Sequence, residues 1–486
     1  MPAVSESRLP PDELAASRPS FAWAPWAVFI AAFLLAAFLP LPGPGPAALT
    51  RGGAYTLAGL LAAVVFWASG VQDPSLSGLL IITLLSLLGV MPFERAVAGF
   101  GTEFVWLLVV TFILAQAMAD TGLGRRIALA LLHRAGGRPA MVLLALLGTV
   151  LVLAFMVPTA AGRISMILPV VLGIIEAARI PPSSRFAKAM LIGTSHVSIM
   201  VGIGLMTAAG ATVYAAGAFG NLIDVRWTYL AWLAAFYPLV TVFTFVVWRL
   251  LLWQYPPEQG ELTAGAEYVT HELRVLGALA TPERKMLAVF AVIFFLWVIG
   301  PRWGITTPQA GMIGALALLM PGVRVLSWER ALSSVRWNVI ILFGVSLALA
   351  NALDSSGAGA WLTSATLGIV AHPSPVAVAL IIAPLVLLIR IGFVNNLGMI
   401  AAGLPLAFTL AKGWGLNPLW TGMVVVMTAG PGFLLPTQTP TGMITVGYEY
   451  YTIRDYLRSG IPASIVLLAL TWLAAFVYWP LLGYRP

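Results

Sequence analysis

The chain carries one apolar segment twice, and this duplication limits its possible folds more than any other feature. Residues 112–124 read FILAQAMADTGLG, and residues 347–359 read LALANALDSSGAG. Two further pairs of segments follow in the same order and at nearly the same separation. They are 159–169 with 395–405, and 206–210 with 438–442. Three matched pairs in one order indicate two copies of a single structural unit.

Composition places this duplicated unit in lipid. Hydrophobic residues make up 60% of the chain and charged residues 9%, and the mean hydropathy is +0.96, which excludes a soluble globule. Several apolar runs are long enough to cross about 30 Å of hydrocarbon as helices. They are 21–39, 55–69, 104–119, 227–248 and 459–478. The absence of cysteine excludes disulfides and thiolate metal sites. In membrane proteins, duplicated units of this kind are typical of secondary transporters.

The basic residues predict how the two copies are inserted. The net charge of +8 comes from Lys and Arg beside the predicted spans, so it does not indicate a nucleic-acid partner. Connections after the second copy hold Lys412 alone, whereas those after the first copy are strongly basic. The basic residues of the first copy are Arg125, Arg126, Arg134, Arg138, Arg179, Arg185 and Lys188. Because Lys and Arg mark cytoplasmic loops, the two halves are expected to have opposite orientations.

We therefore predict an all-α polytopic membrane protein with inverted repeats, about eleven transmembrane helices and two re-entrant hairpins. Residues 1–20 are expected to form a disordered cytoplasmic tail, and 21–253 the first inverted repeat with its preceding helices. Residues 254–284 form a cytoplasmic linker, and 285–486 the second inverted repeat. We expect a plasma (inner) membrane location, with the N-terminus cytoplasmic and the C-terminus outside.

Four predicted helices are interrupted at positions that correspond in the two halves. The interruptions lie at 158–162, 206–210, 393–396 and 436–442, and they carry small hydroxyl and amide side chains. Unpaired backbone groups are costly in hydrocarbon, so such breaks survive where they line a wet cavity or face protein. Helix N-termini after the breaks would direct N–H groups at one point, which favours an anion. Close helix packing is the alternative explanation.

Three segments carry a resemblance to a known family. They are WNVIILFGVSLALA at 337–350, LLPTQTPTGMITVGY at 434–448 and TGLGRRIA at 121–128. They resemble the divalent anion/sodium symporter family, the sodium-coupled di- and tricarboxylate and sulfate carriers of the ion-transporter superfamily, over roughly residues 54–480. The resemblance implies a homodimer in the lipid bilayer, with a scaffold domain and a transport domain that moves as an elevator. It implies a secondary active transporter of small divalent anions, coupled to Na+ or working as an anion exchanger.

The resemblance also implies site residues, although the chain departs from the family motif. The family reads Ser-Asn-Thr at each hairpin tip, where this chain reads Pro158-Thr159-Ala160 and Val394-Asn395-Asn396. The implied substrate-binding residues are Thr159, Thr207, Asn395, Asn396, Thr439 and Pro440. The implied coupling-ion residues are Thr159, Met206, Asn395 and Gln438.

Two arginines fall inside the membrane, close to these tips. A charged side chain at that depth costs about 2.5–3.5 kcal/mol on insertion scales, so it predicts a function. Arg163 is a candidate for bidentate binding of the anion, and pairing with a helix end or snorkelling is the alternative. In sodium-coupled members, a small hydroxyl residue near the position of Arg390 helps to hold one sodium ion. A guanidinium there would displace that ion, so we hypothesise that at least one sodium site is lost and that the protein exchanges anions or uses another coupling ion.

Other titratable residues give weaker expectations. His196 lies near the first broken helix and is a candidate for proton coupling, with buried packing as the alternative. The remaining histidines lack metal-ligand spacing, so no metal site is predicted. A cation/proton antiporter or arsenite-type permease of the same superfamily is the alternative function, but it would require Asp or Glu near the breaks. No catalytic constellation is present in the sequence, so we expect no enzyme activity and no cofactor beyond Na+ as a coupling ion.

Overall fold

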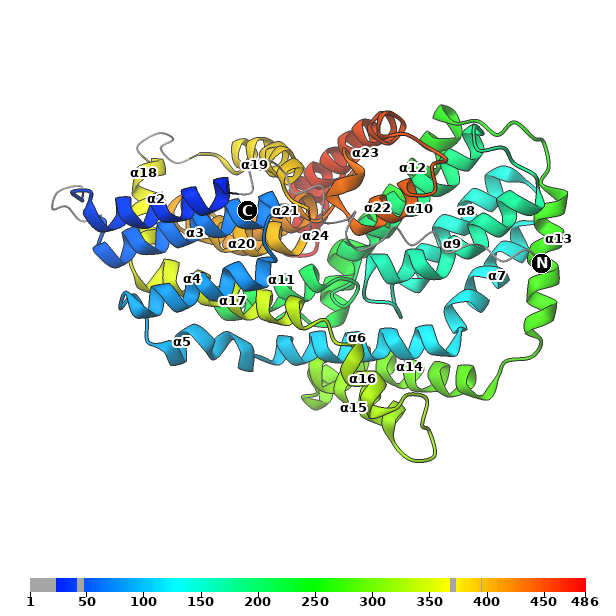
Figure 1. Ribbon diagram of the computed structural model, residues 1–486, viewed down its shortest axis with the longest axis horizontal. Helices are drawn as coiled ribbons and strands as arrows, with labels where there is room; N and C mark the ends of the chain where they lie inside the picture. The colour runs from blue at the N-terminus through cyan, green and yellow to red at the C-terminus, as the bar shows by residue number, and fades with distance from the viewer. Residues whose placement is uncertain (1–22, 42–47, 368–372, 395) are drawn as a thin grey trace.

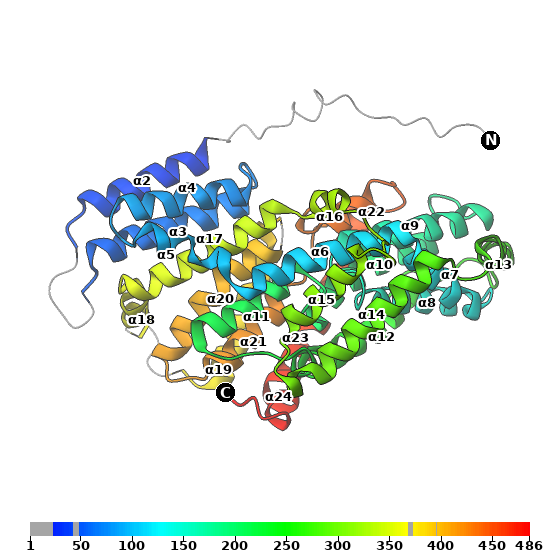
Figure 2. The same ribbon diagram turned by 90° about the horizontal axis from the view of Figure 1, so that it is seen from below.

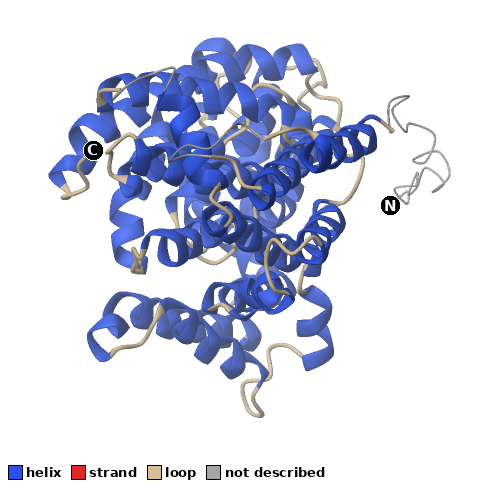
Figure 3. Ribbon diagram, turned by 90° about the vertical axis from the view of Figure 1, so that its left-hand side faces the viewer, coloured by secondary structure: helices blue, strands red, loops and turns tan. Residues whose placement is uncertain are grey.

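The computed structural model describes residues 23–41, 48–367, 373–394 and 396–486, and every regular element within these ranges is a helix. Figure 3 shows the described chain as helices joined by loops. Nine of the described helices are long and apolar enough to cross a membrane, judged by length and composition. The prediction of an all-α polytopic membrane protein is confirmed.

The first half contains three helices, then the first copy of the repeated segment, and then a hairpin and a broken helix. The opening helices are α2 (Ala24–Phe38), α3 (Arg51–Ser69) and α4 (Pro74–Leu87). The repeated segment and its flanks form α5 (Phe93–Val97), η1 (Ala98–Gly101), α6 (Glu103–Thr121) and α7 (Leu123–Ala135). The remaining helices are α8 (Pro139–Leu153), α9 (Ala160–Ala177), α10 (Arg185–Gly204), α11 (Gly210–Ile223) and α12 (Tyr229–Gln254).

The second half repeats this order of elements. Its first helices are α14 (Thr281–Ile299), η2 (Gly300–Trp303) and α15 (Thr307–Leu319). The second copy and its flanks form α16 (Trp328–Ser334), α17 (Trp337–Ser355) and α18 (Ala358–Leu367). The hairpin and broken helix are α19 (Pro375–Ile389), η3 (Arg390–Gly392), α20 (Asn396–Gly413), α21 (Pro418–Ala429), η4 (Pro436–Gln438) and α22 (Pro440–Val446). The chain ends with α23 (Ile453–Leu473), the π-helical η5 (Ala474–Tyr478) and α24 (Trp479–Leu481).

Both ends of the α8–α9 hairpin lie at one end of the molecule. They pack beside α7 and beside α13 (Thr263–Leu276), a helix within the predicted linker. The N–H of Leu262 donates to the carbonyl of Gly137 at 2.7 Å, where the hairpin begins. Arg125 on α7 forms an ion pair with Glu272 on α13. A segment that enters and leaves at the same end is a re-entrant hairpin, as the sequence predicts.

The two hairpins approach the middle of the molecule from opposite ends. In both Figure 1 and Figure 2, α8 and α9 lie towards one end, whereas α19 and α20 lie towards the other. This placement brings the tip of each hairpin close to the breaks between α10 and α11 and between α21 and α22.

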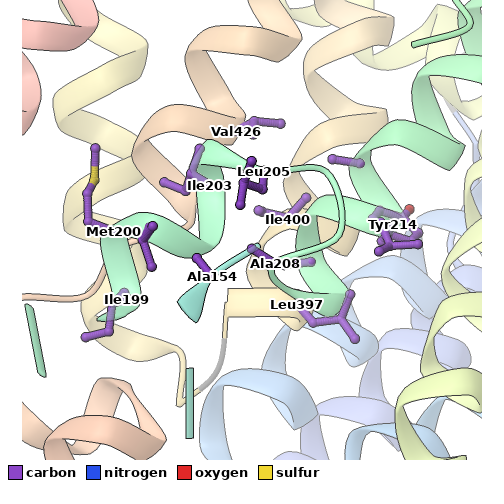
Figure 4. Close-up of a cluster of buried hydrophobic side chains, with 14 of the residues drawn as sticks. Ala154, Ile199, Met200, Ile203, Leu205, Ala208, Tyr214, Leu397, Ile400 and Val426 are labelled. Atoms are coloured by element: carbon purple, nitrogen blue, oxygen red, sulfur yellow. The ribbon is translucent and has the colours of Figure 1, made fainter. Parts of the chain in front are cut away.

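Protein surrounds the break between α10 and α11. Helix α10 is the most buried of the candidate membrane spans, because 94% of its 18-residue apolar stretch is buried inside the molecule. Figure 4 shows Leu205 and Ala208, in the turn that follows, within a cluster of buried apolar side chains that includes Ile203 and Val426. The indole N–H of Trp232 donates to the carbonyl of Ile203 at 2.9 Å. The break therefore does not expose unpaired backbone to lipid.

A glutamine and a glycine shape the break between α21 and α22. The Oε1 atom of Gln438 accepts hydrogen bonds from the N–H groups of Leu434 at 3.0 Å and Leu435 at 2.8 Å. Helix α23 passes so close that a Cβ atom on Gly460 would lie 1.9 Å from the carbonyl oxygen of Phe433. Glycine is therefore required at position 460 for this arrangement of the break.

Candidate functional site

A cavity of about 260 Å³ lies where the hairpin tips and the helix breaks of the two halves meet, and we call it the central cavity. Its wall also includes the starts of α4 and α17. The described polar residues that the tips and breaks contribute are Thr159, Arg163, Arg390, Asn396, Gln438 and Thr439.

Three long helices begin at the central cavity. Helices α9, α11 and α20 start at Ala160, Gly210 and Asn396, and these residues line the cavity. The first N–H groups of a helix have no intrahelical acceptor, and the helix dipole gives that end a partial positive charge. The convergence of these three ends favours a negatively charged ligand.

Two threonines, Thr159 at the first hairpin tip and Thr439 at the second broken helix, cap the helices that follow them. The Oγ1 atom of Thr159 accepts the N–H of Gly162 at 3.0 Å, and that of Thr439 accepts the N–H of Gly442 at 3.2 Å. The Thr159 hydroxyl acts here only as an acceptor towards the described residues, so its hydrogen remains available to a ligand. Both residues line the central cavity.

The guanidinium of Arg163 is fully buried and joins the first tip to the first broken helix. Its Nη1 atom donates to the carbonyls of Val157 at 2.7 Å and Ala208 at 2.9 Å, and its Nη2 atom donates to the carbonyl of Ser198 at 2.7 Å. Val157 precedes the tip, Ala208 lies in the break and Ser198 lies on α10. Its two terminal nitrogens therefore serve backbone carbonyls rather than an anion in this arrangement, while its buried Nε–H has no partner among the described residues.

Arg390 joins the second hairpin tip to the second broken helix in the same way. Its Nη1 atom donates to the carbonyl of Phe393, just before the second tip. Its Nη2 atom donates to the carbonyl of Gln438 at 2.9 Å, and the side-chain amide of Gln438 donates back to the carbonyl of Arg390 at 3.1 Å. Arg390 is also fully buried. Each half therefore holds one guanidinium between its hairpin tip and its helix break.

These contacts bear on sodium binding. Backbone carbonyls of unwound helices are the groups that coordinate Na+ in many transporters. Here carbonyls of both tips and both breaks accept hydrogen bonds from Arg163 and Arg390. A sodium ion at the same oxygens would meet a fixed positive charge at short range in a poorly screened interior. The residues at these two places do not fit a bound sodium ion.

The structure brings most of the predicted site residues together. Those that line the central cavity are Thr159, Arg163, Arg390, Asn396, Gln438, Thr439 and Pro440. Met206, Thr207 and His196 are buried but do not line it. Asn395 lies outside the described residues.

His196 sits in an aromatic environment away from the cavity. Its ring centroid lies 4.6 Å from that of Tyr456 and 5.0 Å from that of Phe433. Its Nε2 atom lies 3.3 Å from the hydroxyl of Ser459. These contacts are typical of a packing histidine. Within the described residues, no group of three or more His, Cys, Asp or Glu side chains could hold a metal ion.

Four polar residues of the cavity wall were missed by the sequence analysis. Asp73 and Ser75 lie at the start of α4, and Arg336 and Asn338 lie at the start of α17. Arg336 directly precedes α17, the helix that carries the start of the second repeated segment, and the corresponding position in the first copy is Gly101. A residue-by-residue comparison of the two copies would have singled it out as a charge without a counterpart.

Comparison with known proteins decides the family. A family model described as the sodium:sulfate symporter transmembrane region matches residues 21–484. The chain belongs to this family. The resemblance seen in the sequence is confirmed, and the protein is a membrane transporter rather than an enzyme.

Individual relatives cover most of the chain. A membrane protein of Cupriavidus necator is 29% identical over 94% of this chain and 93% of its own length. A sodium-dependent dicarboxylate transporter, SdcS, of Staphylococcus saprophyticus is 26% identical over 90% of this chain and 88% of its own. An L-tartrate/succinate antiporter of Shigella dysenteriae is 25% identical over 79% and 80%. The solved YdaH transporter of Alcanivorax borkumensis covers 96% of this chain and 98% of its own, with a TM-score of 0.51 and 15% identity, so it shares the fold.

Proposed function

We propose that this protein exchanges small divalent anions across the membrane, with dicarboxylates ahead of sulfate-like oxyanions. The observation that carries the proposal is the central cavity, where three helix N-termini and the capping threonines of both halves meet. Its volume of about 260 Å³ is below the ~300–1,000 Å³ typical of pockets for drug-sized ligands, which favours a small solute. Relatives named as a dicarboxylate transporter and a tartrate/succinate antiporter support this class of cargo.

Exchange, rather than sodium symport, follows from the two buried arginines. Arg163 and Arg390 place two permanent positive charges beside the cavity, where a symporter would have sodium ions that bind and dissociate in each cycle. A divalent anion compensates both charges, whereas the empty site keeps them. Moving uncompensated charge through a low-dielectric region is costly, so the empty carrier should cross the membrane much more slowly than the loaded one. Slow return of the empty carrier makes transport an exchange.

The moving parts follow from the same arrangement. Under this proposal the hairpins and broken helices form the transport domain, and α2–α6 with α14–α17 form the scaffold of a homodimer. The transport domain moves as an elevator with its cargo. The end that holds α7 and α13 faces the cytoplasm, because the basic residues of the first half gather there.

Purified protein in liposomes tests this function. Uptake of labelled succinate should be several-fold faster into vesicles loaded with unlabelled succinate than into empty vesicles. The true cargo should also raise the Tm of the detergent-solubilised protein in a dose-dependent way, because a ligand that binds only the native state stabilises it by mass action. Succinate, malate, tartrate, citrate and sulfate form the panel. Equal uptake into loaded and empty vesicles, or no response to any of these anions, would contradict the proposal.

A further inference from the structure

Arg336 is a cation at the central cavity whose side chain is not engaged. It occupies the N-cap position of α17 and is exposed where it lines the cavity. Towards the described residues its side chain forms no hydrogen bond or ion pair, whereas the terminal nitrogens of Arg163 and Arg390 are bound to carbonyls. Its five N–H donors are therefore available for an oxyanion, which a guanidinium can bind through two parallel hydrogen bonds.

Arg336 also stands where the cavity meets a second hollow. This hollow, which we call the vestibule, has a volume of about 450 Å³ and lies between α6, α7 and α9. The vestibule and the central cavity share the lining residues Phe112, Thr159 and Arg336. A solute that moves from one to the other passes the guanidinium of Arg336.

The second half contains a matching hollow. This far pocket, of about 490 Å³, lies between α11, α17, α18 and α20 and includes Asn351, as the vestibule includes the matching residue Gln116. Among the described residues, the far pocket and the central cavity have no lining residue in common, whereas the vestibule and the cavity share three. The counterpart of Arg336 in the first copy is Gly101, so the feature exists on one side only.

The other charges near this junction are already paired or capping. Arg125, which lines the vestibule, forms an ion pair with Glu272. Asp73 lines the central cavity, where its Oδ1 atom accepts the N–H of Ser75 at 2.8 Å and caps α4. These contacts leave Arg336, next to the hydroxyl of Thr159, as the cation at the junction whose terminal nitrogens have no partner among the described residues.

We propose that Arg336 is a one-sided binding residue, which holds one oxyanion group of the cargo while the tips face the vestibule and loses it when they move away. The inference rests on the proposed function, because it assumes an anionic cargo and a fixed α17. It makes the transporter asymmetric: the apparent affinity on the vestibule side includes a guanidinium, and the affinity on the far side does not.

The test uses the absence of cysteine in the natural chain. In liposomes that contain Arg336→Cys, an impermeant thiol reagent reacts only with molecules whose vestibule faces the bath. Loss of a charged hydrogen bond should raise the KM for bath succinate in these molecules by about tenfold to a hundredfold. A cationic methanethiosulfonate should restore much of the affinity, whereas an anionic one should not. Arg302→Cys is the matched control, because Arg302 is exposed beyond α14 and lines neither hollow.

Two results would refute the role of Arg336, provided that the wild type exchanges anions. One is an unchanged KM in Arg336→Cys, and the other is an equal effect of the cationic and anionic reagents. Failure of the wild type to exchange any anion refutes the proposed function instead. Arg336→Lys keeps the charge and should retain most of the affinity. A Tm near that of the wild type shows that the variants are folded.

Discussion

Arg163→Ala should abolish anion exchange and lower the free energy of unfolding, because each buried carbonyl left without its donor costs about 1–3 kcal/mol. The substitution leaves the carbonyls of Val157, Ala208 and Ser198 without their shared donor. The first tip then loses its connection to the first broken helix, and the capping geometry at Thr159 is no longer held in place. Thermal unfolding in detergent and counterflow in proteoliposomes measure the two effects.

Arg302→Ala serves as the control for this substitution. It makes the same Arg-to-Ala change at an exposed position that does not line the cavity. Both the stability and the exchange rate should stay near the wild-type values. Another result would favour the other role that the sequence allows for Arg163, direct binding of the anion. If Arg163→Ala kept the wild-type Tm but lost stabilisation by the anion, the guanidinium would be an anion ligand rather than a link between backbone segments.

Arg390→Ser should convert the exchanger into a sodium-dependent transporter. Removal of the guanidinium frees the carbonyls of Phe393 and Gln438 and leaves a small hydroxyl beside them. Oxygen ligands of this kind suit Na+. Without sodium we expect exchange to fall more than about tenfold, in line with the loss of two charged hydrogen bonds, and added sodium should restore part of it. Succinate uptake measured against sodium concentration, with choline as the replacement, gives the result.

Arg390→Lys is the informative partner variant. An ammonium group keeps the positive charge near the same carbonyls, so this variant should show no response to sodium. Sodium that fails to increase uptake by Arg390→Ser would show that the space left by the guanidinium is not a cation site. Sodium stimulation of both variants would show that charge at position 390 does not control the coupling.

The architecture could be predicted because the duplication and the hydropathy pattern are properties of the sequence itself. The repeated segments predicted α6 and α17, and the four polar interruptions predicted the hairpin tips and helix breaks to within a few residues. These features are local: a break needs residues that end a helix, and a span needs about 20 apolar residues. Their convergence on one cavity followed from the symmetry of the two halves.

The roles of individual polar residues could not be predicted in the same way. The position of Arg163 in the sequence is compatible with binding an anion or a helix end, and the choice depends on carbonyls contributed by α10 and by the first break. Arg336 comes from a helix that is distant in sequence from the tips, so its place at the cavity depends on how the helices pack. Thr207 shows the converse, because the resemblance assigned it to the anion site while its side chain is buried away from the cavity.

We propose that two built-in guanidinium groups, those of Arg163 and Arg390, take the place of coupling cations. The most direct measurement is succinate exchange by the wild-type protein in liposomes with sodium fully replaced by choline on both sides. We expect the same rate in the sodium and choline media. A steep, cooperative dependence of the rate on sodium concentration would contradict it.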